Sequence, residues 1–413
     1  MRLAPGVAVL LVLAGCAPRR LVPVPGAAVV RVGIVVDQAA GEFSATGQFR
    51  VLGPDGDILA VVDRGVAWRV EPGDAPDRLT LVRPDRAAPD VVSQPVAVRP
   101  ERAEDLVLIA GRPYRGEAVV LRGSTGVTIV NRVPLEWYTQ SVVAAELGMR
   151  GADERAAVMA QAVATRTFAL HNRGRREALG FDLFATVADQ VYPGVSGEKD
   201  AVTAATQATA GQILTWHGAP IEAIYHSACG WSTEAADQVF RSGEVVPYLR
   251  AVSDRYGPGD SDYYCRGSPS FRWRQEWDGA TLSVVLAQTL PAVLGAAAAN
   301  PGRVTDVAAT KTTPTGRVAE LVVTTTSGAY TVPGNRVRDV LRSAPDRPLP
   351  SSLFQLYPQR QGGELVKVVA AGAGAGHGVG MCQWGAVGRA RAGQSYDRIL
   401  TTYYPGTRLE RVY

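Results

Sequence analysis

The chain has 413 residues, of which 46% are hydrophobic and 20% are charged, and its formal net charge is +4. This length allows two or three domains, and the balanced composition indicates folded domains with complete cores and excludes a disordered chain. The sequence has no lysine- or arginine-rich run interleaved with aromatic residues, so nucleic acid is not an expected partner. A mildly basic surface is compatible with an acidic polymer.

The first residues have the pattern of an exported lipoprotein. An apolar run from Leu3 to Ala14 follows an arginine and is too short to span a bilayer, which is typical of a signal peptide. The next residues resemble a bacterial lipobox, so residues 1–16 are expected to be a signal peptide cleaved before Cys16, which is then lipidated. The alternative is an ordinary signal peptide with an incidental cysteine. Acyl chains would hold the exported protein on a membrane, and Ala17 favours the periplasmic face of the outer membrane in a Gram-negative cell.

A tether and a β-rich domain are predicted next. Residues 17–29 contain three prolines and two arginines, which is typical of an extended linker. Residues 30–113 alternate short Val, Ile and Leu runs with Gly, Pro and Asp, which predicts strands. This segment has no histidine and no cysteine, so we assign it to placement rather than chemistry. Residues 114–123 and 127–131 then predict a hairpin that opens a second domain, residues 114–413.

The stretch from Val133 to Leu170 predicts two helices joined by a short turn. Pro134 is compatible with the first turn of a helix, and Gly148 offers a stop. Asp153 is expected to cap the second helix, which should continue to about His171.

Glu146 is the notable acid of this helical hairpin. It is embedded among alanine and valine residues, and a carboxylate in an apolar pocket has a raised pKa that lets it hold a proton near neutral pH. Glu146 is therefore a candidate general acid. The alternative is a solvent-facing glutamate in the last helical turn.

Six blocks of sequence together resemble one known family. They are SVVAAELG with AQAVATRTFAL around Glu146, DQVYPG (189–194), YHSACG (225–230), PYLRAVSD (247–254), GHGVGMCQWGA (376–386) and YYPGT (403–407). In this order they resemble the stage II sporulation protein D (SpoIID/LytB) family, which comprises peptidoglycan-cleaving lytic transglycosylases and their relatives. With the patterns above, the resemblance implies an α+β fold: a β-rich N-terminal domain, then a mixed α/β core with the helix hairpin and a β-rich C-terminal portion.

The resemblance also implies a reaction at the linkage between N-acetylmuramic acid and N-acetylglucosamine. Glu146 would protonate the glycosidic oxygen and then accept the proton of the muramoyl C6 hydroxyl as a 1,6-anhydro ring closes. One acid is sufficient for this reaction, whereas glycoside hydrolysis normally takes two, and no cofactor is required. The residues expected to contact the glycan strand are Gln161, Arg166, Tyr192, Tyr225, His226, Ser227, His377 and Gln383.

Two of these residues have further roles to consider. Gln161 and Arg166 would also support Glu146, and Arg166 could equally pair with a structural acid. His377 and Gln383 lie in a glycine-rich stretch, residues 372–388, that lacks the spacing of a nucleotide-binding loop and predicts a helix beginning near Gln383.

Three cysteines remain after Cys16. One interpretation is a disulfide between Cys229 and Cys265, with Cys382 buried. The other is a structural zinc ion, because His226, Cys229 and Cys265 offer three suitable ligands. Some members of the resembled family are thought to hold zinc near this position. The two interpretations exclude each other, because a thiolate ligand cannot also form a disulfide.

Two other functions remain open. Some relatives are described as enhancers of cell-wall amidases, so the chain could be a glycan-binding activator without chemistry of its own. A zinc hydrolase would instead use His226, Cys229 and Cys265 around an open coordination site.

Overall fold

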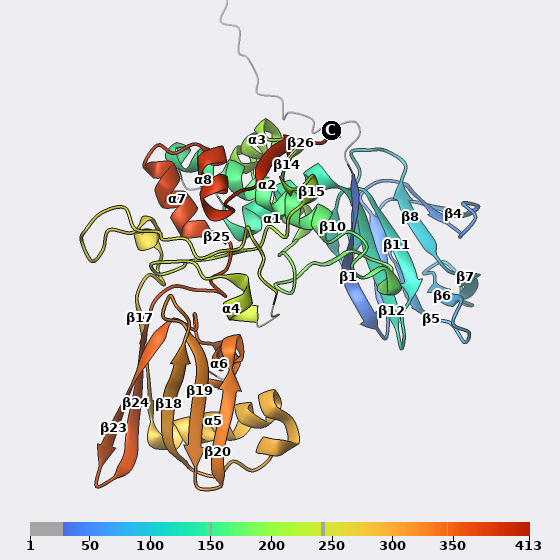
Figure 1. Ribbon diagram of the computed structural model, residues 1–413. Helices are drawn as coiled ribbons and strands as arrows, with labels where there is room; N and C mark the ends of the chain where they lie inside the picture. Colours follow the sequence, from blue (N-terminus) through green and yellow to red (C-terminus); the bar gives the residue numbers. More distant parts are fainter. Residues whose placement is uncertain (1–27, 149–150, 241–243, 345) are drawn as a thin grey trace, which may run out of the picture.

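The computed structural model describes residues 28–148, 151–240, 244–344 and 346–413 (Figure 1). The predicted signal peptide, Cys16 and all but the last two residues of the predicted tether lie outside these ranges. Strands form the N-terminal region and a C-terminal lobe, and most helices lie between them, so the predicted α+β class is confirmed.

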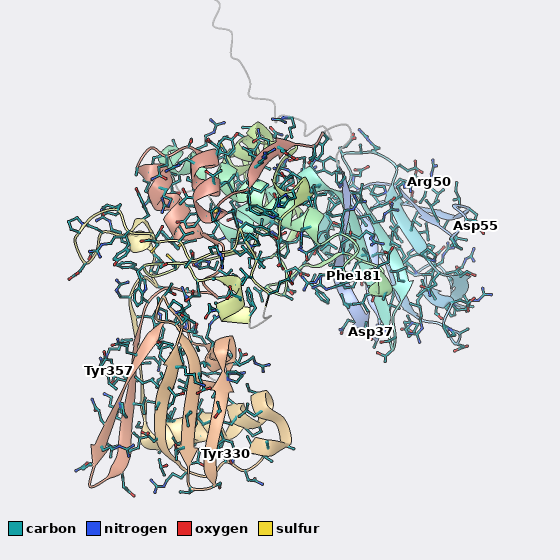
Figure 2. All side chains as sticks on the ribbon, in the orientation of Figure 1. Asp37, Arg50, Asp55, Phe181, Tyr330 and Tyr357 are labelled. Carbon is teal, nitrogen blue, oxygen red and sulfur yellow. The ribbon has the colours of Figure 1, made fainter. Side chains whose placement is uncertain are left out.

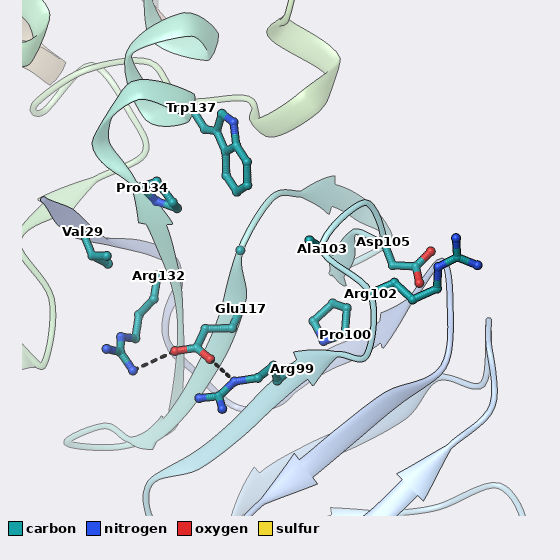
Figure 3. Close-up of a pocket in the computed structure, with 11 residues that line it drawn as sticks. Val29, Arg99, Pro100, Arg102, Ala103, Asp105, Glu117, Arg132, Pro134 and Trp137 are labelled. Atoms are coloured by element: carbon teal, nitrogen blue, oxygen red, sulfur yellow. Dashed lines mark hydrogen bonds and ion pairs between the residues drawn. The ribbon is translucent and has the colours of Figure 1, made fainter. Parts of the chain in front are cut away.

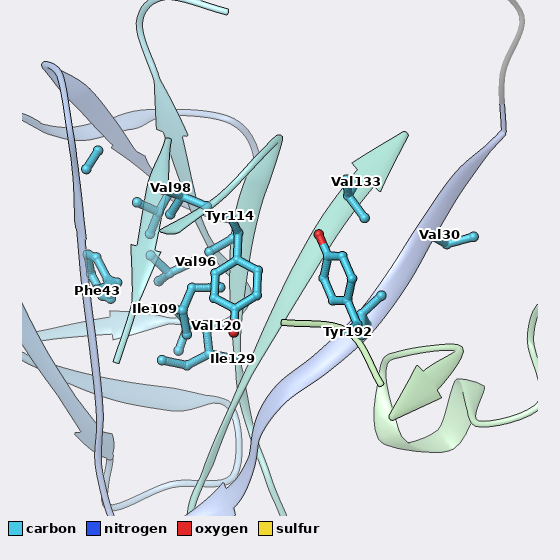
Figure 4. Packing of buried hydrophobic residues seen from close by; sticks show 14 of the residues in the cluster. Val30, Phe43, Val96, Val98, Ile109, Tyr114, Val120, Ile129, Val133 and Tyr192 are labelled. Carbon is cyan, nitrogen blue, oxygen red and sulfur yellow. The ribbon is translucent and has the colours of Figure 1, made fainter. Parts of the chain in front are cut away.

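Two sheets pack face to face at the N-terminal end. In spatial order, the first contains β13 (Leu183–Phe184), β1 (Val29–Gln38), β12 (Val127–Pro134), β11 (Glu117–Arg122), β8 (Val96–Pro100), β3 (Phe49–Leu52) and β4 (Ile58–Val62). The second contains β10 (Arg112–Tyr114), β9 (Val107–Ile109), β2 (Gly41–Ala45), β5 (Trp68–Pro72), β6 (Arg78–Val82) and β7 (Asp90–Ser93). Successive side chains of a strand point to opposite faces, so Val96 and Val98 of β8 both point inward, towards Phe43 and Ile109 of the other sheet (Figure 4).

The predicted hairpin is present as β11 and β12, which pair from Glu117 with Arg132 to Arg122 with Val127. Each strand also has a second partner in the N-terminal sheet, since β12 pairs with β1 and β11 pairs with β8. Strand β10 crosses the expected boundary at residues 113 and 114. The hairpin therefore belongs to the N-terminal sheets. The domain boundary predicted between residues 113 and 114 cuts through these sheets.

The chain returns to the first sheet after the helix hairpin. Strand β13 pairs in parallel with β1, and Asp182 accepts hydrogen bonds from the backbone and guanidinium nitrogens of Arg31 at 2.9 and 2.8 Å. Phe181 lies beside the N-terminal strands in Figure 2, where its ring is close to Gly33. The helical part and the N-terminal sheets thus share contacts on both sides of β1.

The predicted helix hairpin is present, with α1 at Leu135–Glu146 and α2 at Arg155–His171. Gly148 adopts a positive φ of 67° directly after α1, as a helix stop requires. The predicted cap of α2 is wrong: Asp153 lies inside a 3₁₀ turn, Ala152–Glu154, and no side-chain cap bond is present. Helix α2 begins directly after this turn. Backbone groups of the turn can therefore take the place of a side-chain cap.

Further short elements surround the hairpin. They are α3 (Asp200–Ala208), α4 (Ala236–Phe240), α7 (Gln383–Arg391), α8 (Tyr396–Tyr403), β14 (Gln212–Trp216), β15 (Ala219–Pro220), β16 (Tyr225–His226), β25 (Met381–Cys382) and β26 (Arg408–Arg411). Strand β14 pairs with β15 and β26, and β16 pairs in parallel with β25. The predicted helix at Gln383 is confirmed as α7.

A separate hydrophobic cluster organises the C-terminal lobe, drawn in orange in Figure 1. Its elements are β17 (Trp273–Asp278), α5 (Gly279–Leu294), β18 (Val304–Thr312), β19 (Val318–Thr325), β20 (Gly328–Pro333), α6 (Val337–Val340), β21 (Arg342–Ala344), β22 (Arg347–Pro348), β23 (Phe354–Gln361) and β24 (Glu364–Gly372). Among the described residues, the helical segment Gly279–Ala298 is long and apolar enough to cross a membrane. Its Leu282, Leu286 and Leu290 are buried in the cluster of this lobe.

Candidate active site

Glu146 is the last residue of α1 and faces the loop that carries Val191. Its Oε1 accepts a hydrogen bond from the backbone N–H of Val191 at 2.9 Å. The residue is half-buried, so the fully solvent-facing alternative does not describe its position. Burial raises the pKa of the Glu146 carboxyl group, and the bond from Val191 opposes part of that rise. This environment favours a carboxyl group that keeps its proton to a higher pH than an ordinary glutamate.

Two buried glutamines meet next to this glutamate. The Nε2 atom of Gln383, at the start of α7, lies 3.4 Å from Oε1 of Gln161 on α2. The same Nε2 lies 3.4 Å from the backbone oxygen of Glu146. Gln161 also donates to Oγ1 of Thr165 at 3.3 Å. These contacts join α1, α2 and α7 at one point, so Glu146, Gln161 and Gln383 are brought together as predicted.

A chain of polar side chains leads from α1 to β16. The hydroxyl group of Tyr138 donates to Gln190 at 2.9 Å, and Gln190 donates to the hydroxyl oxygen of Tyr225 at 3.0 Å. Burial raises the pKa of Tyr225, and the charge of Glu146 raises it further. The sequence did not single out Tyr138 or Gln190, although Gln190 lies in the DQVYPG block.

His226 and His377 lie next to each other, with ring centroids 5.5 Å apart. Nδ1 of His377 accepts from the backbone N–H of Val379 at 3.1 Å, so its Nε2 donates to the Tyr225 carbonyl oxygen at 2.9 Å. Nδ1 of His226 lies 3.1 Å from the carbonyl oxygen of Val379 and donates to it. Burial lowers the pKa of both imidazoles to about 3. The two neutral rings therefore hold the glycine-rich stretch against β16.

Ser227 contributes its backbone to the same junction. Its carbonyl oxygen accepts a hydrogen bond from the backbone N–H of Trp384 at 3.0 Å. The end of β16 is thereby fixed to the first turn of α7, next to Gln383.

Tyr192 occupies a different environment from the one predicted for a glycan contact. It is 3% exposed, and its hydroxyl group donates to Oδ1 of Asn131 at 2.9 Å. Its ring packs against Tyr114 and Tyr138 at centroid distances of 5.7 and 5.0 Å. Figure 4 shows Tyr192 beside the N-terminal strands. In this structure its contacts join the DQVYPG loop to β12.

Arg166 is fully buried and pairs with Glu136, which is the structural alternative considered for it. Its Nε and NH2 atoms donate to the two carboxylate oxygens of Glu136 at 2.7 and 2.9 Å. A third bond runs from NH1 to the backbone oxygen of Gln212 at 2.9 Å. Glu136 also accepts from Gly211 N–H and the Tyr413 hydroxyl group. The guanidinium group is thus saturated by protein partners.

The three cysteines form a buried cluster with one acid. The Sγ atoms of Cys229, Cys265 and Cys382 and a carboxylate oxygen of Asp254 all lie within 4.8 Å of one another. The cysteines are free, and Sγ of Cys229 lies 3.6 Å from Sγ of Cys265, well beyond a disulfide bond length of about 2.05 Å. His226 is not a member of this cluster. The donor set therefore differs from the predicted one, with Cys382 and Asp254 in place of the histidine.

The surroundings of the cluster differ from those of a catalytic metal centre. Cys229, Cys265, Cys382 and Asp254 are each 0% exposed. A catalytic zinc ion needs an open position that water or substrate can reach. The predicted alternative of a zinc hydrolase around these cysteines therefore has no accessible position in this arrangement.

A pocket of about 310 Å³ lies away from this site, where the N-terminal sheet meets the start of α1 (Figure 3). Glu117 accepts from Arg99 and is paired with Arg132 at its wall, both at 2.7 Å. Trp137 closes the helical side. Trp137 precedes Glu146 by nine residues, which corresponds to about 13 Å along a helix. This pocket is thus separate from the candidate active site.

Comparisons with known proteins identify families and relatives that this chain resembles. The model of the family described as stage II sporulation protein matches residues 123–216, and a domain of unknown function matches residues 258–380. Stage II sporulation protein D of Bacillus subtilis is 30% identical over 295 residues, which cover 68% of this chain and 75% of that protein. The amidase enhancer of the same species is 31% identical over 274 residues, 61% of this chain and 38% of that protein. An uncharacterised protein of Brachyspira hyodysenteriae is 29% identical over 306 residues, 73% of this chain and 74% of that protein.

Proposed function

The chain belongs to the stage II sporulation protein D family, and from this premise we propose that it is a peptidoglycan lytic transglycosylase. Its substrate would be the bond between N-acetylmuramic acid and N-acetylglucosamine in glycan strands. The observation that supports this proposal most is the position of Glu146. It is half-buried, its Oε1 accepts from Val191 N–H, and its backbone oxygen lies against Gln383, which also meets Gln161.

Glu146 acts first as an acid. Because burial raises its pKa, the carboxyl group keeps a proton that it can transfer to the glycosidic oxygen. The bond between this oxygen and C1 of the muramoyl sugar then breaks, and positive charge develops at C1. Val191 N–H holds Oε1, and this fixes the orientation of the acid during the transfer.

The same group then acts as a base. The Glu146 carboxylate takes the proton of the muramoyl C6 hydroxyl, and the C6 oxygen forms a bond to C1. The product is a 1,6-anhydro sugar, and the proton that left Glu146 in the first step is replaced in the second. Water is not consumed, so a single carboxyl group suffices where hydrolysis normally uses two.

The substitution Glu146→Gln tests this proposal. The amide cannot donate a proton, so release of anhydro-muropeptides from purified sacculi should fall by at least about 10²-fold, as expected for loss of general acid–base catalysis. Products are identified and counted by liquid chromatography and mass spectrometry. Glu364→Gln, at the exposed start of β24, makes the same chemical change away from the site and should leave the rate unchanged. Equal product release by Glu146→Gln and the natural chain contradicts the proposal.

The likeness to an amidase enhancer supports a second candidate function, a glycan-binding activator without catalysis. The same variant separates the two functions. If the chain is only an enhancer, Glu146→Gln keeps its full stimulation of a cell-wall amidase, and neither form releases anhydro products. Stimulation is measured as the rate at which the amidase frees stem peptides from sacculi with and without the chain.

We also propose that the protein is exported and lipid-anchored through Cys16, so that the enzyme works at a membrane surface facing the wall. The lipobox pattern supports this placement. In a Gram-negative cell the periplasmic face of the outer membrane is the expected site. Glycan strands are then the main partner, and a cell-wall amidase is a second.

A further inference from the structure

We propose that Cys229, Cys265, Cys382 and Asp254 bind one zinc ion with a structural role. Zinc fits this donor set, since three thiolates and a carboxylate are ligands that it commonly takes in four-coordinate sites. This proposal does not depend on the proposed enzymatic function. The sequence had joined Cys229 and Cys265 with His226, whereas the structure replaces the histidine with Cys382 and Asp254.

The distances fit a tetrahedral centre. Zinc–sulfur bonds of about 2.3 Å at tetrahedral angles place two sulfurs about 3.8 Å apart. The Sγ atoms of Cys229 and Cys265 are 3.6 Å apart, and no pair of donor atoms in the cluster is separated by more than 4.8 Å. A pair of sulfurs at that upper limit would have to approach by about 1 Å to reach the tetrahedral spacing.

The backbone around Cys382 has the arrangement expected of a metal-bound sulfur. Sγ of Cys382 accepts hydrogen bonds from the N–H groups of Cys229 and Gly385 at 3.1 and 3.2 Å. Cys382 directly precedes α7, so its sulfur also lies at the positive end of that helix. Both features stabilise negative charge on sulfur and orient it, as outer-shell groups do around metal ligands.

Asp254 is oriented by partners of its own. One carboxylate oxygen accepts from the Tyr403 hydroxyl group at 2.6 Å and lies 3.4 Å from Arg389. The other accepts from the backbone N–H of Cys265 at 2.9 Å. The positive charge of Arg389 offsets part of the negative charge that three thiolates and a carboxylate bring to the centre.

Small residues let the elements approach closely enough for this arrangement. A Cβ atom on Gly388 would lie 2.0 Å from the backbone oxygen of Tyr264, the residue before Cys265. A Cβ atom on Gly385 would lie 2.1 Å from the hydroxyl oxygen of Tyr403. Helix α7 therefore presents glycines to the two neighbours that hold Cys265 and Asp254.

The zinc ion would fix the base of the candidate active site. Cys382 precedes Gln383, and Cys229 follows His226 and Ser227 at the end of β16. An ion that links Cys229, Cys265 and Cys382 therefore joins residues 153 positions apart. It would hold the start of α7 in register with β16 and so maintain the position of Gln383 next to Glu146.

Metal content tests the proposal directly. The full chain, purified in detergent with a reducing agent and without chelators, should contain about one zinc ion per molecule by elemental mass spectrometry. After exchange with cobalt(II), it should show the thiolate charge-transfer and visible bands of a tetrahedral cobalt centre. A folded, metal-free chain with three free thiols, or one in which peptide mapping joins Cys229 to Cys265, overturns the proposal.

Variants then separate the observed donor set from the one expected from sequence. Cys382→Ser and Asp254→Asn should each lower zinc content and thermal stability, whereas His226→Asn should retain the ion. If Cys382→Ser fails to fold, a thiol-modifying mercurial applied to the natural chain gives the answer, because modification should release zinc in step with the loss of free thiols. Zinc lost from His226→Asn but kept by Cys382→Ser overturns the assignment.

Discussion

Two glutamates of α1 show how their surroundings set different roles for the same side chain. Burial raises the pKa of Glu146, and only the Val191 N–H opposes it. Burial acts in the same direction on Glu136, but the charge and hydrogen bonds of Arg166 outweigh it and lower the pKa of that carboxyl group. Glu136 is therefore an ionised structural residue, and Glu146 is the one suited to exchange a proton.

The substitution Arg166→Met should lower the free energy of unfolding by about 3–5 kcal/mol, because it leaves the Glu136 carboxylate buried without its partner. Adding Glu136→Gln should recover much of this loss, since the amide oxygen still accepts from Gly211 and Tyr413 without a charge. Denaturant unfolding measures both changes.

Arg173→Met is the control, because Arg173 lies exposed just after the same helix and should change stability by less than about 0.5 kcal/mol. If Arg166→Met unfolds like the natural chain but raises KM for glycan, then Arg166 is the substrate contact expected from the sequence and not a structural residue.

At the residue level, the sequence identified several polar residues because they lie in short blocks. Glu146, Gln161 and Gln383 were all singled out, and the structure brings them together. The sequence could not identify the buried cluster of three cysteines and one aspartate, because Asp254 and Cys382 are 128 positions apart and meet only in the folded chain. His226 was favoured over them by its spacing from Cys229, but a side chain in a short strand points according to its register, which places this imidazole towards Val379.

The loop at residues 189–194 is the element that positions Glu146, the proposed catalytic acid. Val191 N–H binds Glu146, and Gly194 O accepts from the Ser141 hydroxyl group of the same helix at 2.7 Å. Gly194 adopts a φ of 72°, and a Cβ atom there would lie 2.5 Å from the backbone oxygen of Pro113. The loop is therefore held between α1 and the N-terminal strands, and this glycine permits the close approach.

The substitution Gly194→Ala should destabilise the protein and also slow the proposed reaction, since displacement of the loop moves the Val191 N–H that holds Glu146. Gly111→Ala is a matched control, because its φ of 74° imposes the same backbone strain while a Cβ atom there meets nothing within 4 Å. The difference in unfolding free energy between the two variants should be about 1–3 kcal/mol, the cost of overpacking. Equal unfolding free energies, or an unchanged rate of anhydro-muropeptide release, would show that the loop does not depend on Gly194.

The helices and strands were predictable because hydrophobic periodicity and turn-forming residues are local features of the sequence. The β11–β12 hairpin, both helices of the helical hairpin and the start of α7 all follow from short patterns. Hydrophobic periodicity does not identify the partner of each strand. The sequence predicted that β11 and β12 begin a new domain. In the structure, β12 pairs with β1, which lies about 100 residues earlier in the chain.

On the scale of the whole molecule, the N-terminal sheets and the helix hairpin share one hydrophobic core. Val30 of β1, Tyr114 of β10, Tyr138 of α1 and Phe168 of α2 belong to the same buried cluster. The Arg31–Asp182 pair adds a polar link between β1 and the segment after α2. A core of this kind cannot be divided at residue 113 without exposing apolar surface on both parts.

A chain that begins at residue 114 should therefore fail to fold as a unit. It lacks β1 and β8, so β11 and β12 lose their outer partners, and Asp182 is left buried without Arg31. A chain that begins at residue 28 keeps every described element and should unfold at the same temperature as the full chain. Calorimetry compares the full chain with the chains that begin at residues 28 and 114. The chain from residue 114 should show no cooperative transition, because the side chains of Tyr138, Phe168 and Tyr192 lose the strands against which they pack. A single transition at the natural temperature for the chain from residue 114 would mean that the contacts across β1 contribute little, and that residues 114–413 form an independent domain.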